Sequence, residues 1–259
     1  MYDNVCKYLA ERFPGAMGRW LLGLDLPLVS LPPTELIPAP IRADSLICLH
    51  STTHILHLEF QTHPDPEMPV RMLDYAVRLY RKYPGVRLHQ VVVYLRQTSS
   101  PQVYQGCFEQ ANTVHRFQVV RLWEVDAERL LGEEGLLPWV VLAEPEGGER
   151  RLRQVRERLE RISDRQLRAE LGAATAVLAG LALDRGVIQQ ILGDVDMKES
   201  VIYQAWRQEA LQEGLEQGRL VEARRIARQL LHMGMDPQQV MTITGLSQDE
   251  LNQLSRQQN

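Results

Sequence analysis

The sequence predicts an α/β fold followed by an all-helical C-terminal region. Four segments have strand character, and one helical segment, Pro69 to Tyr83, lies between the second and the third of them. Strands that alternate with helices in this way are typical of α/β architecture. After the Glu- and Gly-rich stretch 144–149, every segment has helical periodicity, so we place a boundary near residue 145. Three of the strand segments are 44–49, 54–61 and 90–95, and the fourth strand lies within 115–125.

The N-terminal elements follow from apolar spacing and from proline. Residues 4–23 repeat apolar side chains at helical intervals, but Pro14-Gly15 interrupts the pattern, so two short helices are expected. Residues 26–41 contain five prolines and are therefore expected to be extended or looped.

The two strands 44–49 and 54–61 are expected to form a hairpin. Segment 54–61 alternates strictly, so Ile55, His57, Glu59 and Gln61 share one face. If the four residues between the strands form the loop, facing residues have numbers that sum to about 103, and Asp44 lies opposite Glu59. Strand geometry alone then brings two acids and an amide together.

The helix over 69–83 and strand 90–95 complete the predicted core. Met72, Ala76, Leu79 and Tyr83 recur at helical spacing, and Pro84-Gly85 ends the helix. Segment 90–95 is almost continuously apolar, as expected of a strand that is covered on both faces.

We divide the chain into an α/β domain, 1–145, and a helical region, 146–259, whose function is expected to be packing or oligomerisation. Residues 236–256 have the outline of a helix-turn-helix, but the second helix begins Gln248-Asp249-Glu250. Acidic residues there would repel phosphate, which favours a packing or self-association unit over a groove-reading one. The helices expected before it are 150–162, 164–183, 185–193 and 198–233.

Composition excludes several classes of protein. The chain has 259 residues, a net charge of −4 and 44% hydrophobic residues, values typical of a globular protein. It has no apolar run long enough to span a membrane, its N-terminus lacks a signal-peptide pattern, and its three separated cysteines suggest neither a disulfide framework nor a zinc motif. A cytoplasmic protein without membrane contact is expected.

Asp44 and Glu59 are the candidate metal ligands. Two facing carboxylates repel one another and are costly to bury unpaired, and Mg²⁺, a hard cation with oxygen ligands, relieves both costs. In the alternative interpretation Glu59 is an exposed rim residue or pairs with Arg42. Residues 71–96 contain six basic residues against one acidic, and Arg71, Arg78 and Arg81 share a helix face that could bind a polyanion or be merely solvated.

Several separated segments, in order, resemble the Rpn-type (YhgA-like) recombination-promoting nucleases, a transposase-like family of the PD-(D/E)XK nuclease superfamily. The likeness extends over roughly residues 1–210. It rests on Ile41-Arg42-Ala43-Asp44-Ser45-Leu46-Ile47 and Leu56-His57-Leu58-Glu59-Phe60-Gln61-Thr62, and on segments 2–9, 20–23, 68–75, 79–84, 121–124 and 199–204.

The resemblance implies a restriction-endonuclease-like core, in which helices flank a mixed four-stranded sheet, and Mg²⁺-dependent hydrolysis of DNA, with Mn²⁺ as a substitute. It implies that Asp44 and Glu59 bind the metal. Gln61 stands where the superfamily usually has Lys, and it adds no positive charge, so slower turnover or a degenerate site is the alternative. Arg71, Arg78 and Arg81 would engage DNA.

Further residues are expected to support the metal site, and the protein is expected to form a homodimer. Some superfamily members add an acid from an early helix, for which Asp3 and Glu11 are both candidates. His57 would support the ligands from the same strand face, and Tyr75 would either contact phosphate or pack. A homodimer through the C-terminal helices would supply the two active sites that a double-strand break needs. The alternative function is a catalytically weak nucleic-acid-binding or assembly protein that retains the fold.

Overall fold

The computed structural model describes residues 2–31, 47–193, 219, 222–231, 233 and 235–247. The chain divides into two compact units, Met1–Tyr203 and Gln204–Asn259, which are described separately. This division differs from the boundary predicted at residue 145. None of the helices in these ranges combines the length and the apolar character needed to cross a bilayer.

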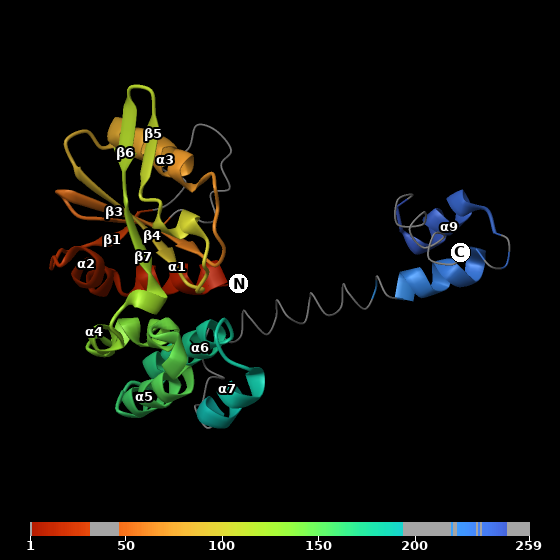
Figure 1. The fold of residues 1–259 in the computed structure, drawn as a ribbon. Helices are drawn as coiled ribbons and strands as arrows, with labels where there is room; N and C mark the ends of the chain where they lie inside the picture. The colour runs from red at the N-terminus through yellow and green to blue at the C-terminus, as the bar shows by residue number, and fades with distance from the viewer. Residues whose placement is uncertain are drawn as a thin grey trace. The chain divides into compact units, whose positions relative to one another are not determined.

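A five-stranded mixed sheet lies at the centre of the first unit (Figure 1). The first two strand pairs are antiparallel and the last two are parallel. The α/β class is therefore confirmed, with one strand more than the four that the family resemblance implies. In spatial order the strands are β1 (Val29–Leu31), β2 (Ile47–His50), β3 (His54–Gln61), β4 (Arg87–Tyr94) and β7 (Gln118–Arg121).

The β2–β3 hairpin has a register two residues away from the predicted one. Cys48 lies opposite His57, so facing residues have numbers that sum to 105. The Ser51 side chain explains the difference, because its Oγ accepts the backbone N–H of His54 at 3.1 Å and closes a tighter turn than the four-residue loop. A shift of two residues leaves every side chain on its predicted face. Asp44, predicted opposite Glu59, lies outside the described residues.

Helices pack on the sheet much as the periodicity predicts. Residues 4–23 form α1 (Tyr2–Arg12) and α2 (Pro14–Leu22), separated at Phe13. The helix predicted over 69–83 is α3 (Met68–Lys82). The inner face of α3 buries Met68, Met72, Tyr75 and Leu79 against the sheet.

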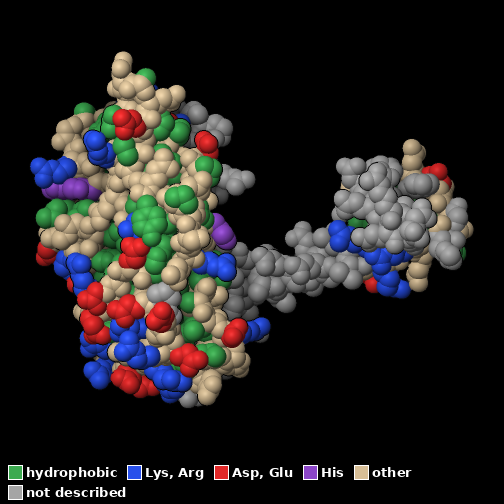
Figure 2. All heavy atoms as spheres, viewed as in Figure 1, with side chains coloured by type: hydrophobic (Ala, Val, Ile, Leu, Met, Phe, Trp, Pro, Cys, Tyr) green, Lys and Arg blue, Asp and Glu red, His purple; other side chains and the backbone are tan. Residues whose placement is uncertain are grey.

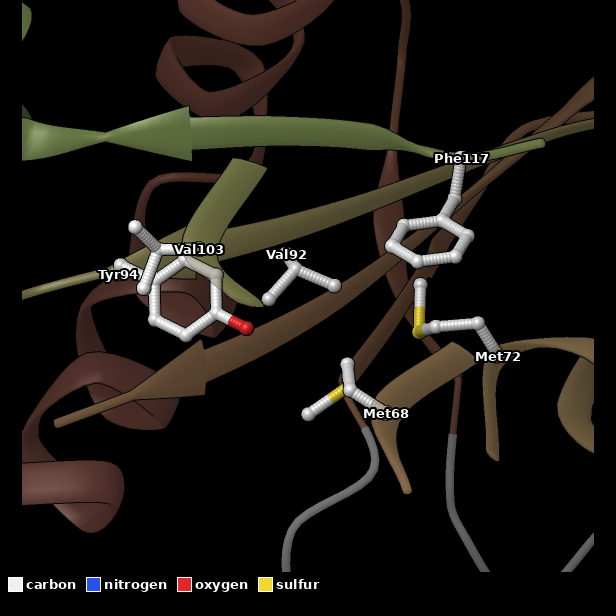
Figure 3. Close-up of a cluster of buried hydrophobic side chains, with 6 residues drawn as sticks. All are labelled: Met68, Met72, Val92, Tyr94, Val103 and Phe117. Atoms are coloured by element: carbon white, nitrogen blue, oxygen red, sulfur yellow. The ribbon is translucent and has the colours of Figure 1, made fainter. Parts of the chain in front are cut away.

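Figure 3 shows how α3 meets β4. Met68 and Met72 point from the helix towards Val92 and Tyr94 of the strand, and Phe117 closes the cluster beside Met72. All of these side chains are almost completely withdrawn from water, which stabilises the helix–sheet contact by about 1.5–3 kcal/mol for each large apolar side chain. This contact fixes α3 over the face of the sheet on which Glu59 of β3 lies.

The region 101–125 is more broken than predicted. A short 3₁₀ helix, η2 (Pro101–Tyr104), precedes a separate hairpin of β5 (Cys107–Gln110) and β6 (Thr113–Arg116). The strand expected within 115–125 is β7, but it is shorter than that range, whose other residues include the end of β6 and the 3₁₀ helix η3 (Leu122–Glu124).

The helices after residue 125 belong to the same unit as the sheet. The apolar segment η4 contacts α4, α5 and α6, and its Trp139 stacks on Phe60 of β3 with ring centroids 6.0 Å apart. Tyr8 of α1 donates a 2.6 Å hydrogen bond to Glu170 of α6. These contacts explain why the chain does not divide at residue 145. The elements are α4 (Ala127–Leu131), η4 (Glu134–Leu142), η5 (Pro145–Gly147), α5 (Gly148–Glu160), α6 (Arg165–Ala179) and α7 (Arg185–Leu192).

The second unit contains a helix over 222–231 and the helix α9 (Pro237–Thr244). Ala227, Val240 and Leu246 form its buried core. The Asp236 side chain caps α9 by accepting the Gln238 N–H, and Gly245 ends the helix in the left-handed region, as a C-terminal glycine commonly does. The helix predicted after Ser247, and most of the one predicted over 198–233, lie outside the described residues.

Candidate active site

Glu59 is a buried acid at the centre of the sheet. It is 1% exposed, on the β3 face that α3 covers, and β2 and β4 flank β3. Its Oε1 atom has no hydrogen-bond partner within the part of the chain that the structure describes. The interpretation of Glu59 as an exposed rim residue is therefore wrong. A buried carboxylate oxygen without a partner is costly, so it is a natural position for a cation or a proton.

His57 faces Glu59 along the same strand. Its Nε2 lies 3.5 Å from Glu59 Oε1, and that nitrogen also has no hydrogen-bond partner among the described residues. On the other side of the ring, Nδ1 lies 2.9 Å from Nε2 of Gln90, the residue directly opposite in β4. His57 is thus held between a buried acid and a buried amide.

The orientation of Gln90 fixes the tautomer of His57. Gln90 Nε2 donates to the Met72 carbonyl at 2.8 Å, and because a carbonyl only accepts, this atom must be the amide nitrogen. The second amide hydrogen is then directed at His57 Nδ1, which must accept it. Neutral His57 therefore carries its proton on Nε2, the nitrogen nearest Glu59. His115 Nε2 completes the network by contacting Gln90 Oε1 at 2.6 Å.

Burial and the charge of Glu59 together raise the pKa of neighbouring side chains. Burial raises the pKa of the Cys48 thiol to about 12, and the nearby Glu59 carboxylate acts in the same direction. Burial and then Glu59 also raise the pKa of Tyr75 to about 12. The Tyr75 ring meets the His57 ring edge-on, with centroids 5.0 Å apart. Tyr75 is thus a packing neighbour of the site.

The structure distinguishes the two acids predicted from the early helix. The pKa of Asp3 is raised by burial and, in addition, by the charge of Glu59, so Asp3 lies within electrostatic range of the site. Glu11, at the other end of α1, accepts a 3.2 Å hydrogen bond from Ser30 near the surface. The charge of Glu59 therefore acts on Asp3, whereas the Glu11 carboxylate is engaged with Ser30.

The donor set for a metal is partial within the described ranges. Glu59 offers an unpartnered oxygen, which fits a hard cation, and Gln61 is half-buried two residues farther along β3. No group of three or more His, Cys, Asp or Glu side chains that could hold a metal is found among these residues. A complete site would need Asp44, which is not among them.

The three arginines predicted to contact DNA lie on the outer side of α3. Arg71 forms an ion pair with Asp65, and Arg78 Nε lies 3.0 Å from Asp74 Oδ2, whereas Arg81 is exposed. A phosphate would therefore compete with acids of the same chain for two of them. In the view of Figure 2, acidic and basic side chains alternate over α4–α7, so the strongly single-signed surface expected of a polyanion footprint is not found on this face.

Sequence reasoning missed Gln90 and Cys48. Gln90 is a buried polar residue at the start of an apolar strand, and that contrast was a usable signal. Its pairing with His57 depends on the parallel β3–β4 register, which no local pattern reveals. Cys48 faces His57 only in the observed register of the hairpin.

One comparison with known proteins finds a match in the C-terminal part of the chain. Residues 220–256 match the family model described as "Rpn/YhgA-like nuclease family, C-terminal HTH domain". This match lies outside the segments that carried the Rpn-type resemblance, the last of which ends at residue 204, and it supports that resemblance independently. No curated protein and no solved structure matches the chain.

The match also bears on the C-terminal unit. The helix-turn-helix outline predicted from residues 236–256 agrees with the description of the domain, and an HTH domain suggests DNA binding. The packing or self-association role that we preferred for this segment stays a prediction. The acidic residues Asp249 and Glu250, on which it rests, lie outside the described residues.

Proposed function

Taking the match to the Rpn/YhgA-like nuclease family as the premise, we propose that this protein is a metal-dependent DNA endonuclease of the PD-(D/E)XK class. The observation that carries the proposal is Oε1 of Glu59, an acid buried in the middle of the sheet, because this oxygen has no hydrogen-bond partner among the described residues. A fold retains such a costly group only if something compensates for it, and a bound cation is the compensation that the family suggests.

The proposed roles follow from the chemistry of each side chain. Asp44 and Glu59 would hold Mg²⁺ or Mn²⁺, which when bound lowers the pKa of water and polarises a phosphoryl oxygen. Gln61 would orient the attacking water by hydrogen bonding. His57 would donate from Nε2 towards Glu59, so it would position that carboxylate and would not itself bind the metal. Asp3 would add negative charge near the cation.

DNA affinity would come from two parts of the chain. The HTH domain would bind the duplex, and the arginines on the outer side of α3 would contact its backbone. Arg71 and Arg78 must exchange Asp65 and Asp74 for phosphate, so binding through them would weaken as salt rises.

A plasmid-nicking assay in Mg²⁺ or Mn²⁺ tests the proposal. We expect Asp44→Ala and Glu59→Gln to reduce nicking about 100-fold or more, because loss of a residue that only supports a metal ligand already costs roughly 10–100-fold. Glu109→Gln, a neutralised acid on exposed β5, is the matched control and should nick like wild type. Equal nicking by wild type and both site variants would show that the activity does not reside in this site.

A second function is favoured by one specific observation. Gln61 replaces the usual Lys of the superfamily, so the site lacks the positive charge that stabilises developing charge on phosphate. With the HTH domain intact, such a protein would bind DNA without cutting it. Binding of a labelled duplex by wild type, together with no nicking in either metal, would support this alternative.

A further inference from the structure

The outer half of α3 carries an exposed apolar row. Val70 is 47% exposed, Val77 46% and Tyr80 51%, and Leu73 between them is partly exposed. Their spacing of three, four and three residues places all four on one stripe of the helix. The stripe runs along one flank of the helix, beside the face that α3 buries against the sheet. We call Val70, Leu73, Val77 and Tyr80 the α3 stripe.

This spacing is the one that helices use to pack against other helices. Apolar residues alternating at three and four residues form a seam whose side chains interlock with those of a second helix. Single exposed apolar residues are normal on a protein surface, but four on one stripe form a contiguous patch, which usually marks an interface. The α3 stripe therefore has the pattern of a surface that packs against a partner helix.

The charges beside the stripe are complementary to those of a second, antiparallel α3. If Leu73 faces Val77 of the partner subunit, then Val70 faces Tyr80 of the partner subunit, and the two-fold axis passes near residue 75. The same arrangement brings Asp74 beside Arg81 of the partner subunit, and by symmetry the pair forms twice.

Asp74 has the capacity for this second contact. Arg78 of the same helix engages its Oδ2 atom, which leaves Oδ1 to accept from another guanidinium. Arg81 is exposed at the end of the helix and can reach outwards. We propose that α3 is a homodimerisation helix, which pairs antiparallel with α3 of a second copy through the α3 stripe and two Asp74–Arg81 ion pairs.

The proposal is independent of the proposed metal site, because it uses neither Glu59 nor a metal, but it engages Arg81 and so leaves Arg71 and Arg78 as the α3 arginines for DNA. It is also distinct from the dimer expected through the C-terminal helices. Its failure would leave the nuclease proposal untouched, and an inactive protein could still dimerise in this way.

Site-specific cross-linking of the full-length chain gives a direct test. In a Cys107→Ser background, Leu73→Cys and Val77→Cys would be made separately, because Cys6 and Cys48 are buried. With a short thiol cross-linker, a mixture of the two variants should form covalent dimers that combine one chain of each kind. Absence of mixed dimers, or a stronger cross-link within Leu73→Cys alone, as a parallel pair would give, overturns the proposal. If another part of the same chain covers the stripe, neither variant will form cross-linked dimers, and that result also overturns the proposal.

Charge reversal tests the ion pairs. Asp74→Arg alone places Arg beside Arg, and Arg81→Asp alone places Asp beside Asp, so each should weaken the α3-mediated dimer about tenfold. Mixing the two variants creates complementary pairs in the heterodimer and should restore association in sedimentation. Glu149→Arg, which breaks an exposed ion pair on α5, is the matched control and should leave association unchanged. Failure of the mixture to associate better than either variant alone contradicts the proposed pairing.

Discussion

Gln90 and His57 lie directly opposite one another on parallel strands and are joined by a 2.9 Å hydrogen bond inside the sheet. The same amide nitrogen contacts the Met72 carbonyl of α3, so a single side chain connects β4, β3 and the covering helix. His57 is consequently presented to Glu59 in one tautomer. A buried network of this kind specifies its own geometry only when each member is satisfied.

Removal of the Gln90 amide is expected to destabilise the fold. Gln90→Leu would leave His57 Nδ1, the Met72 carbonyl and His115 Nε2 without their shared partner. We expect a loss of about 1–3 kcal/mol in the free energy of unfolding, the scale of leaving buried polar groups unsatisfied. Urea denaturation measures it. Gln110→Leu on exposed β5 is the control, and equal stability of the two variants would mean that the network contributes nothing.

Neutralising Glu59 should make the protein more stable without metal but abolish its stabilisation by Mn²⁺. Without metal, Glu59→Gln removes a buried carboxylate whose Oε1 has no hydrogen-bond partner in the described part of the chain, so we expect the free energy of unfolding to rise by about 1 kcal/mol. Addition of Mn²⁺ should raise the melting temperature of wild type and of Glu109→Gln, but not that of Glu59→Gln. Thermal melts in EDTA and in Mn²⁺ measure both effects. Equal Mn²⁺ stabilisation of all three proteins would place the metal elsewhere.

Asp3 and Glu11 can be compared directly as partners of the site. Because the charge of Glu59 acts on Asp3, Asp3→Asn should weaken Mn²⁺ binding, measured as the Mn²⁺ concentration that gives half-maximal thermal stabilisation. Glu11 is engaged with Ser30, so Glu11→Gln should have the smaller effect. The opposite order would restore Glu11 as the acid that the early helix contributes.

Local sequence patterns predicted the bounds of the strands and helices at the site better than the register between the strands. Strict alternation located β3 with its correct bounds, and apolar spacing located α3 to within one residue at each end, because burial of one face imposes those periods. The hairpin register was wrong by two residues. Its turn is closed by the Ser51 side chain, and counting residues between strands does not reveal that a hydroxyl replaces a backbone acceptor.

Contacts between distant segments were beyond local patterns. The coupling of Asp3 to Glu59 and the bond of Gln90 to His57 both join residues more than 30 positions apart. They depend on how α1 and β4 pack, and packing is decided by the whole core. The helices after residue 145 are joined to the earlier part of the chain by a contact of the same kind, since Tyr8 of α1 donates a hydrogen bond to Glu170 of α6.

Stability should fall as the solution becomes mildly acidic, and His89 is one cause. Burial, followed by the nearby charges of His54 and Arg87, lowers the pKa of His89 below its ordinary 6.5. The unfolded chain therefore takes up a proton near pH 6.5 that the folded chain does not yet accept. The stabilisation is fully present above that pH and is lost as the pH falls towards the folded-state pKa, with a slope of at most about 1.4 kcal/mol per pH unit for one group.

His89→Phe isolates this contribution. Phenylalanine keeps a ring to stack on His54, whose centroid lies 5.3 Å from that of His89, but it cannot take up a proton. Urea unfolding between pH 7.5 and 5.5 should show a shallower loss of stability for His89→Phe than for wild type. His63→Gln, at an exposed position, should keep the wild-type slope. Because burial also lowers the pKa of His115, the stability of His89→Phe should still depend on pH to some extent. If the free energy of unfolding of His89→Phe falls with pH as steeply as that of wild type, His89 does not cause the loss of stability.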